Sequence, residues 1–327
     1  MIRIVRLANN ILFVLTLLCA GCFMHAGEKS TVQKGEARKD GFQFRWKAPR
    51  EFLVEETIEK QGSKMTLLHT MSVVETNRQF IVRWLACEPL TLNGEKIIDA
   101  ETKQSMASVV ALFVALPPLR ISTNGGFLGI QNAPESIAAT SRNLDRLYPE
   151  RTEEQRQQFR NMMTNSVTLK VYGQILSQYW NTWVENWIGL NLTAGTTFQP
   201  EKGKANVVGG MRVPANVVIR NLGAVKENTN QVHLRYEETT DGPQFAKALA
   251  SEMHNVEKSQ GKPKSKTPAP KSASRAVVME VRTDPATLMP SWAKREIDTT
   301  VEFPGEAART GKESSEYRFY WGDSILK

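Results

Sequence analysis

Hydrophobic and polar residues alternate along residues 42–94. After the Gly62-Ser63 turn, every second residue is apolar or a histidine: Met65, Leu67, His69, Met71 and Val73. A period of two places these side chains on one face of a strand. Similar runs precede and follow this one, and short turns separate them. We therefore expect an antiparallel meander over residues 42–94.

The period changes to that of a helix over residues 101–116, and Pro117 and Pro118 end the pattern. Two short apolar runs then flank Asn124-Gly125-Gly126, which predicts a hairpin. Further helices are expected over residues 134–147 and 152–164. Thr152 is the expected cap of the second of these, because acidic residues follow it in the first turn.

Residues 166–188 form the most distinctive stretch, since large apolar residues recur at intervals of four. This spacing predicts an amphipathic helix with an aromatic face. Two interpretations fit: a core helix packed on the concave side of the sheet, or a helix whose rings line an apolar pocket for an acyl chain. An interfacial membrane helix ranks last, because the polar face lacks Lys and Arg. The candidate lining residues are Tyr172, Tyr179, Trp180, Trp183 and Trp187.

The second half of the chain returns to a period of two between residues 190 and 240 and again between 276 and 321. A helix is expected over 243–257. The Pro/Lys/Ser-rich segment 258–274 cannot bury a core and is expected to be a disordered loop. The last strands should join the sheet begun near Phe42. The pattern thus predicts a single α+β domain over 41–327, with a large, curved, mostly antiparallel sheet and helices packed on one face.

The chain begins with a secretory leader. Arg3 and Arg6 form a basic start, residues 11–18 are apolar, and Ala20-Gly21-Cys22 is a small-residue exit. The apolar run is too short for a membrane-spanning helix, which needs about 20 residues. The leader therefore predicts export.

The ending Leu-Leu-Cys-Ala-Gly-Cys at residues 17–22 resembles the lipobox of bacterial envelope lipoproteins. The resemblance implies a signal peptide over 1–21, lipidation of Cys22, and a flexible tether over 22–40 that anchors the domain on the periplasmic side of a membrane. Phe23 stands where inner-membrane members of that family often have Asp, which favours the outer membrane. The alternative is ordinary cleavage near Ala26, which gives a soluble secreted protein.

The formal net charge of +8 at pH 7 is concentrated in two segments. Arg3 and Arg6 lie in the leader, and the rest of the excess lies in residues 258–275, so the remaining domain is formally neutral. A nucleic-acid-binding protein needs a basic face on the folded domain, and we expect no such partner. The basic segment is a solvated loop or a contact for an anionic surface. Its cationic residues are Lys258, Lys262, Lys264, Lys266, Lys271 and Arg275.

Motifs for catalysis or metal binding are lacking. His254 and Glu257 have the spacing of two ligands on one helical face, but no second histidine follows them. Cys87 could be a nucleophile only with a nearby base, and its place at the end of a predicted strand favours a buried structural cysteine. Adjacent glutamates at 55–56, 153–154 and 237–238 are expected at the solvated surface. We expect no catalytic residues, no metal site and no cofactor.

Two classes of function fit these observations. The layout of strands and helices loosely resembles the half-closed barrels of periplasmic lipoprotein carriers, which implies a non-enzymatic lipoprotein that holds a hydrophobic ligand between the curved sheet and the helix at 166–188. The alternative is a structural or assembly protein of the cell envelope, which binds partner proteins or anionic surfaces through residues 258–275. A hydrolase assembled from scattered residues is a third candidate with no motif in its favour.

Overall fold

The computed structural model describes residues 41–322, except 49, 77, 148, 150–151, 165, 207–211 and 260–267. The expected signal peptide (1–21) and tether (22–40), with Cys22, lie outside the described residues. The middle of the basic segment lies outside them as well.

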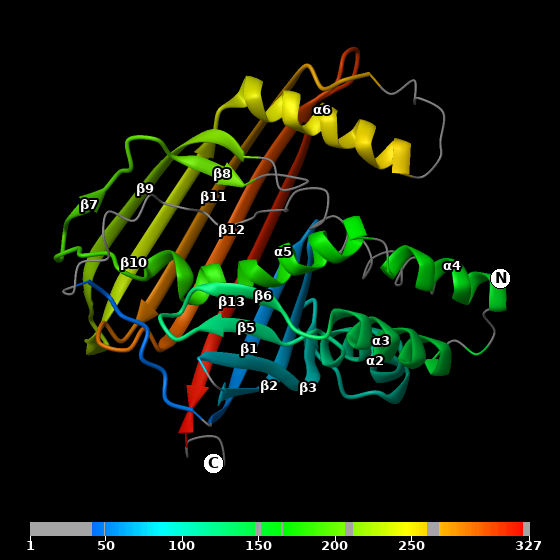
Figure 1. Ribbon diagram of the computed structural model, residues 1–327, viewed down its shortest axis with the longest axis horizontal. Helices are drawn as coiled ribbons and strands as arrows, with labels where there is room; N and C mark the ends of the chain where they lie inside the picture. Colours follow the sequence, from blue (N-terminus) through cyan, green and yellow to red (C-terminus); the bar gives the residue numbers. More distant parts are fainter. Residues whose placement is uncertain are drawn as a thin grey trace.

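The described strands form one 13-stranded sheet, with the order β6-β5-β3-β2-β1-β13-β12-β11-β10-β9-β7, while β4 pairs with β3 and β8 with β9. Every pairing is antiparallel, which confirms that part of the predicted fold (Figure 1). The strands are β1 (Arg50–Lys60), β2 (Ser63–Thr76), β3 (Gln79–Leu92), β4 (Glu95–Lys96), β5 (Leu119–Ser122), β6 (Phe127–Ile130), β7 (Thr197–Phe198), β8 (Lys204–Asn206), β9 (Arg212–Val225), β10 (Asn228–Thr240), β11 (Ser272–Thr283), β12 (Pro290–Glu302) and β13 (Arg309–Trp321).

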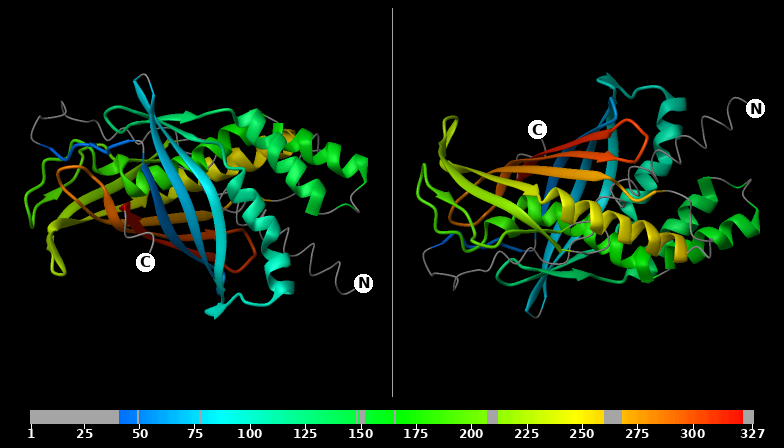
Figure 2. Two further views of the ribbon diagram at one scale, coloured as in Figure 1. Left: turned by 90° about the horizontal axis from the view of Figure 1, so that it is seen from below. Right: turned by 90° about the horizontal axis from the view of Figure 1, so that it is seen from above.

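The first and last long strands of the chain meet in the middle of the sheet. Phe52 of β1 lies opposite Trp321 of β13, and the pairing continues to Lys60 opposite Glu313. This contact joins the β1–β3 meander to the β9–β13 meander, as the sequence predicted for the last strands. The sheet is strongly twisted, so that β1–β3 run steeply across the direction of β9–β12 (Figure 2).

The described helices are α2 (Ala100–Val114), α3 (Ala133–Leu147), α4 (Glu153–Thr164), α5 (Ser166–Trp183) and α6 (Gly242–Ser259), with a 3-10 turn η1 (Glu185–Trp187) after α5. Their positions agree with the sequence predictions to within a few residues, except at the end of α5. Thr152 and Gln155 form a reciprocal cap at the start of α4, since each backbone N–H donates to the other side chain.

Helix α5 packs its aromatic face against the sheet. Trp180 and Trp187 are fully buried, and the Trp183 ring lies 5.2 Å from that of Phe319 on β13. The chain before β1 packs against the same helix, because the Trp46 ring lies 5.1 Å from that of Trp180. The large buried cluster around these rings is the main core of the described residues.

The predicted helix over 166–188 ends early, at Trp183, because Val184 leaves the helical conformation with φ −140° and ψ −55°. The indole N–H of Trp187 donates to the Thr182 carbonyl at 3.0 Å. In a continuing helix, that carbonyl would accept from the amide four residues later. The break keeps Trp183 and Trp187 buried while the chain turns away.

Alternation along β11 shows which side chains meet the helices. Val277 and Val281 belong to the cluster around α5, whereas Ala273 belongs to the cluster around Phe245 of α6. These three positions have the same parity, so they project from the same side of the strand. On the other side, Glu280 forms ion pairs with Arg235 and His233 of β10.

The predicted bounds of the disordered loop, 258–274, were too wide at both ends. Helix α6 extends to Ser259, and β11 begins at Ser272. Arg275 is therefore a strand residue, and its guanidinium donates to Glu238 at 2.7 Å with both side chains buried. Arg275 does not belong to an exposed cationic surface, because the alternation that buries Ala273 and Val277 also turns Arg275 inward.

The glutamate pairs are not all at the surface, which corrects the sequence prediction. Glu56 and Glu238 are buried, with 1% and 8% of their surfaces exposed. The pairs at 55–56 and 237–238 have one member on each face of their strand, so only one member is solvated, whereas 153–154 lies on α4 with both side chains exposed. A partner on the neighbouring strand accompanies each buried carboxylate: His69 for Glu56, and Arg275 for Glu238.

Replacing Gly125 by alanine should destabilise the fold more than the same change at Gly62. Both glycines have positive φ, at +88° and +79°, which costs an L-residue roughly 1–2 kcal/mol. A Cβ on Gly125 would lie 2.6 Å from Phe44 Cβ, whereas a Cβ on Gly62 meets nothing within 4 Å. We expect urea unfolding to give a loss of about 3–5 kcal/mol for Gly125→Ala and about 1–2 kcal/mol for Gly62→Ala. Equal losses would contradict the close packing of this hairpin against Phe44.

Candidate functional site: a groove along α2

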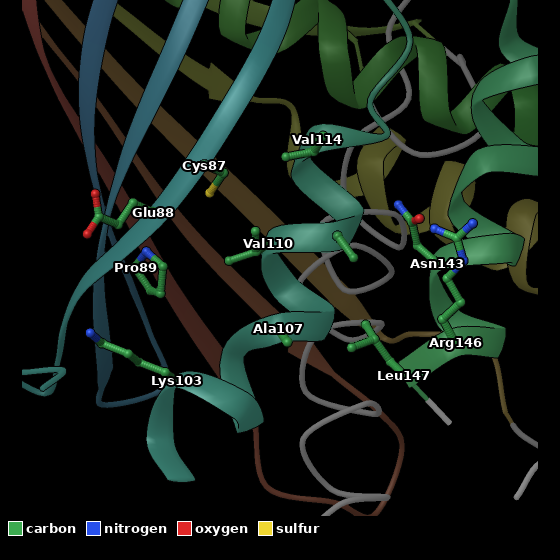
Figure 3. Close-up of a pocket in the computed structure, with 11 residues that line it drawn as sticks. Cys87, Glu88, Pro89, Lys103, Ala107, Val110, Val114, Asn143, Arg146 and Leu147 are labelled. Carbon is green, nitrogen blue, oxygen red and sulfur yellow. The ribbon is translucent and has the colours of Figure 1, made fainter. Parts of the chain in front are cut away.

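A groove of about 580 Å³ runs along α2, between β3 on one side and α3 on the other (Figure 3). Helix α2 supplies its floor, and Val110 and Val114 turn toward the β3 wall in the close-up. The lining is mostly apolar. It consists of Cys87, Glu88 and Pro89 of β3, Lys103, Ala107, Val110, Ala111 and Val114 of α2, and Asn143, Arg146 and Leu147 of α3.

The groove exists because α2 is apolar on two faces. Met106 and Val109 pack into a buried cluster with Met65 and Leu67 of β2. Positions 103, 107, 110, 111 and 114 follow a helical spacing on the adjoining face and form the floor, with Val110 at the border, where it also packs against this cluster. A helix that is apolar on two faces is normally covered on both. Here Val114 remains 39% exposed.

Two cations and one carboxylate belong to the lining. Lys103 lies in the first turn of α2, and Arg146 lies in the last turn of α3. Neither side chain forms an ion pair or a hydrogen bond with the residues that the structure describes. The Glu88 carboxylate points away from α2 in the close-up, since Glu88 alternates with Cys87 and Pro89 along β3 (Figure 3). The charge beside the floor is therefore mainly positive.

Cys87 contributes an inert thiol to the β3 wall. It is 8% exposed and forms no disulfide. Burial above all, together with the negative charges of Glu56 and Glu88, raises the pKa of the Cys87 thiol to about 12. The thiol stays protonated at neutral pH and is a poor nucleophile. The prediction of a buried structural cysteine is confirmed.

A polar cluster lies next to this wall, inside the protein. His69 of β2 is directly opposite Cys87 in the strand register, and its Nε2 lies 2.9 Å from Glu56 Oε2. Both side chains are almost completely buried, and His69 Nδ1 has no hydrogen-bond partner in the described part of the chain. The His69 ring lies 4.9 Å from that of Phe113 on α2. This pair ties β1 to β2 beneath the helix.

Two tyrosines complete the cluster. Burial, with the charge of Glu56 as the next cause, raises the pKa of Tyr179 on α5 and the pKa of Tyr317 on β13. Glu56, His69 and both tyrosines lie outside the groove lining. Their arrangement therefore serves as an internal connection between α5 and three strands rather than as groups that face a bound molecule.

The aromatic residues predicted to line a ligand pocket lie in the main core. Trp180, Trp183 and Trp187 are buried there, with Tyr179 packed against the cluster. Tyr172 lies on α5, and its side chain is outside the described set. The Trp180 indole N–H donates to the Gly125 carbonyl at 2.7 Å, and Tyr179 packs edge-on against Trp84. The described contacts of these two rings are thus with a backbone carbonyl and with another aromatic side chain.

The charged residues of the basic segment have different environments. Lys271 forms an exposed ion pair with Glu302 at 2.8 Å, and Arg275 is buried against Glu238. Lys258 lies near the end of α6, and its side chain is outside the described set, as are Lys262, Lys264 and Lys266. The described cations of this segment therefore do not form a positively charged patch.

The described residues contain no group of three or more His, Cys, Asp or Glu side chains placed to hold a metal ion. None of the helices in the described ranges is both long and apolar enough to cross a membrane. No protein-family model and no curated protein matches this chain. The groove and the sequence are therefore the two sources of support for a function.

Sequence reasoning missed the groove, although the signal was present. Residues 106–116 are almost entirely apolar, which is more than one buried helical face requires. What the sequence could not supply is the position of α3, which forms the second wall.

Removing the Glu56 charge should destabilise the protein much more than removing its neighbour's charge. Glu56→Gln breaks a buried pair with His69, which typically costs about 3–5 kcal/mol. Glu55→Gln, one residue away on the other face of β1, weakens a partly exposed contact with Arg318 and should cost at most about 1 kcal/mol. Urea unfolding at pH 7 measures both losses. Similar small losses in both variants would show that the Glu56–His69 contact contributes little.

Proposed function

We propose that this protein is a non-enzymatic, exported lipoprotein of the bacterial envelope that binds a hydrophobic, lipid-like ligand. The observation that carries the proposal is the apolar groove of about 580 Å³ on the second face of α2. Its volume lies within the range of about 300–1,000 Å³ that is usual for small-molecule sites. In this proposal the ligand lies beside α2, whereas the sequence predicted a site between the sheet and α5.

The chemistry of the lining favours binding over catalysis. Its ionisable groups are a protonated thiol, two cations and a carboxylate that points away, with no base beside the thiol in the lining. A nucleophilic site needs a nucleophile and a base within hydrogen-bond reach. An apolar floor with a few polar groups at its margin is instead typical of a binding pocket.

In this proposal α5 is a scaffold helix. Its rings stack against the sheet and against the chain before β1, which supports the core-helix interpretation of residues 166–188. The helices are taken to pack on one face of the curved sheet, with α2 and α3 at the end where the groove opens. The other face carries ion pairs such as Arg220–Glu237 and is taken to face solvent.

The alternative function, assembly through the basic segment 258–275, has less support. Arg275 is unavailable as a surface group, and Lys271 is already paired with Glu302. The remaining cations would have to act through residues 258–266 alone.

Filling the groove should abolish ligand binding without unfolding the domain. Ala111→Trp places an indole on the groove floor, whereas Gln104→Trp places one at an exposed α2 position outside the lining. With Nile red as a neutral apolar probe, we expect fluorescence enhancement from the native domain and Gln104→Trp, and at least tenfold weaker binding by Ala111→Trp. Circular dichroism and urea unfolding are the controls that test whether both variants fold. Undiminished binding by folded Ala111→Trp would exclude the groove as the site.

In this proposal the leader directs export, and anchoring depends on Cys22, which follows the small residues of the leader. In a bacterial host, Cys22→Ser should remove the lipid and shift the protein from the membrane fraction to the soluble fraction. Mass spectrometry of the mature N-terminus detects the acyl chains, and Cys87→Ser serves as the control that keeps them. Membrane association that persists in Cys22→Ser would end the lipoprotein proposal while leaving export intact.

A further inference from the structure

The groove has a polar end and an apolar remainder. Lys103 stands at one end of the floor, and Ala107, Val110, Ala111 and Val114 follow it. At a rise of 1.5 Å per residue, the floor from position 103 to position 114 is about 16 Å long. From this order of side chains we infer that the ligand is a single-chain amphiphile with one anionic head group, which Lys103 recognises. This inference rests on the proposed function of the groove.

The small side chains on the floor favour a single chain. Ala107 and Ala111 are four residues apart and therefore stack on one line of the helix surface. Val110 and Val114 lie on the β3 side of this line (Figure 3). One alkyl chain lying along the helix axis would contact the two alanine methyl groups and be flanked by the two valines.

The position of Lys103 is not explained by the stability of its own helix. A cation in the first turn opposes the positive end of the helix dipole. The Lys103 ammonium has no partner among the described residues, while Asp99 already caps the helix by accepting from the Thr102 N–H at 2.7 Å. A bound anion would pair with the lysine side chain.

Arg146 supplies a second cation on the α3 wall. In the last turn of α3 it compensates the dipole of its own helix, so its position has a structural explanation that Lys103 lacks. The head group is therefore assigned to Lys103, with Arg146 adding to the positive field across the groove. Glu88 does not oppose this assignment, since its carboxylate points away from α2 (Figure 3).

Displacement of Nile red by ligands with the same chain tests the head group. Decanoate, 1-decanol and decyltrimethylammonium share ten carbons and differ in charge. We expect decanoate to displace the probe at about tenfold lower concentration than 1-decanol, because a charge-assisted hydrogen bond adds to the same apolar contact. The advantage should shrink when sodium chloride is raised from 50 mM to 500 mM.

Lys103→Gln should reduce the decanoate advantage to about threefold or less while leaving 1-decanol displacement unchanged. Lys96→Gln, an exposed cation on β4 outside the lining, is the matched control and should keep the full advantage. Decyl phosphate distinguishes the head groups within the anionic class, and stronger displacement than decanoate would point to a phosphate ligand.

The outcomes separate the two claims. Failure of all three ligands to displace bound Nile red, or failure of the probe to bind, would overturn the proposed function and this inference together. Equal displacement by decanoate and 1-decanol, or a preference for decyltrimethylammonium, would leave an apolar groove in place and overturn the anionic head group. An unchanged decanoate advantage in Lys103→Gln would remove Lys103 as the recognising residue.

Discussion

The packing of α5 against the middle of the sheet is the contact on which the rest of the structure depends. Trp180, Trp183 and Trp187 are buried there, and each such ring removes roughly 150–250 Å² from water, or about 4–6 kcal/mol before entropy losses. The same rings contact the chain before β1 and the β5–β6 hairpin. Displacement of this helix would therefore release both of these segments from the core at once.

Polar groups inside the sheet determine how the strands align. Lys60 pairs with Glu313 at 2.6 Å, Glu56 with His69, and Arg275 with Glu238, and every pair joins two neighbouring strands. A shift of one residue would turn each of these side chains to the other face and leave its partner buried without a counterpart. Compared with well-packed apolar residues of similar volume, such pairs add little net stability. They nevertheless penalise incorrect registers strongly, because a charge that loses its partner stays buried.

The sequence predicted the strands well because alternation depends on local chemistry. It also contained the signal for the buried glutamate: Glu56 shares its parity with Phe52 and Val54, both fully buried. The early end of α5 was not predictable from periodicity, because it depends on a single hydrogen bond from the Trp187 indole N–H to the Thr182 carbonyl. The groove depended on a long-range arrangement, since its walls come from residues about 60 positions apart in the chain, 87–89 and 143–147. The link from Cys87 through His69 to Glu56 needed the register of three strands, which no local pattern contains.

The pairing of β1 with β13 makes the order of synthesis matter. Phe52 meets Trp321, so the partner of β1 is synthesised more than 250 residues after β1 itself. Until then β1 has an unpaired edge and an apolar face, the combination that promotes association between nascent chains. Contacts of such long sequence separation also make folding slow. The first meander therefore keeps this edge open until β13 has been made.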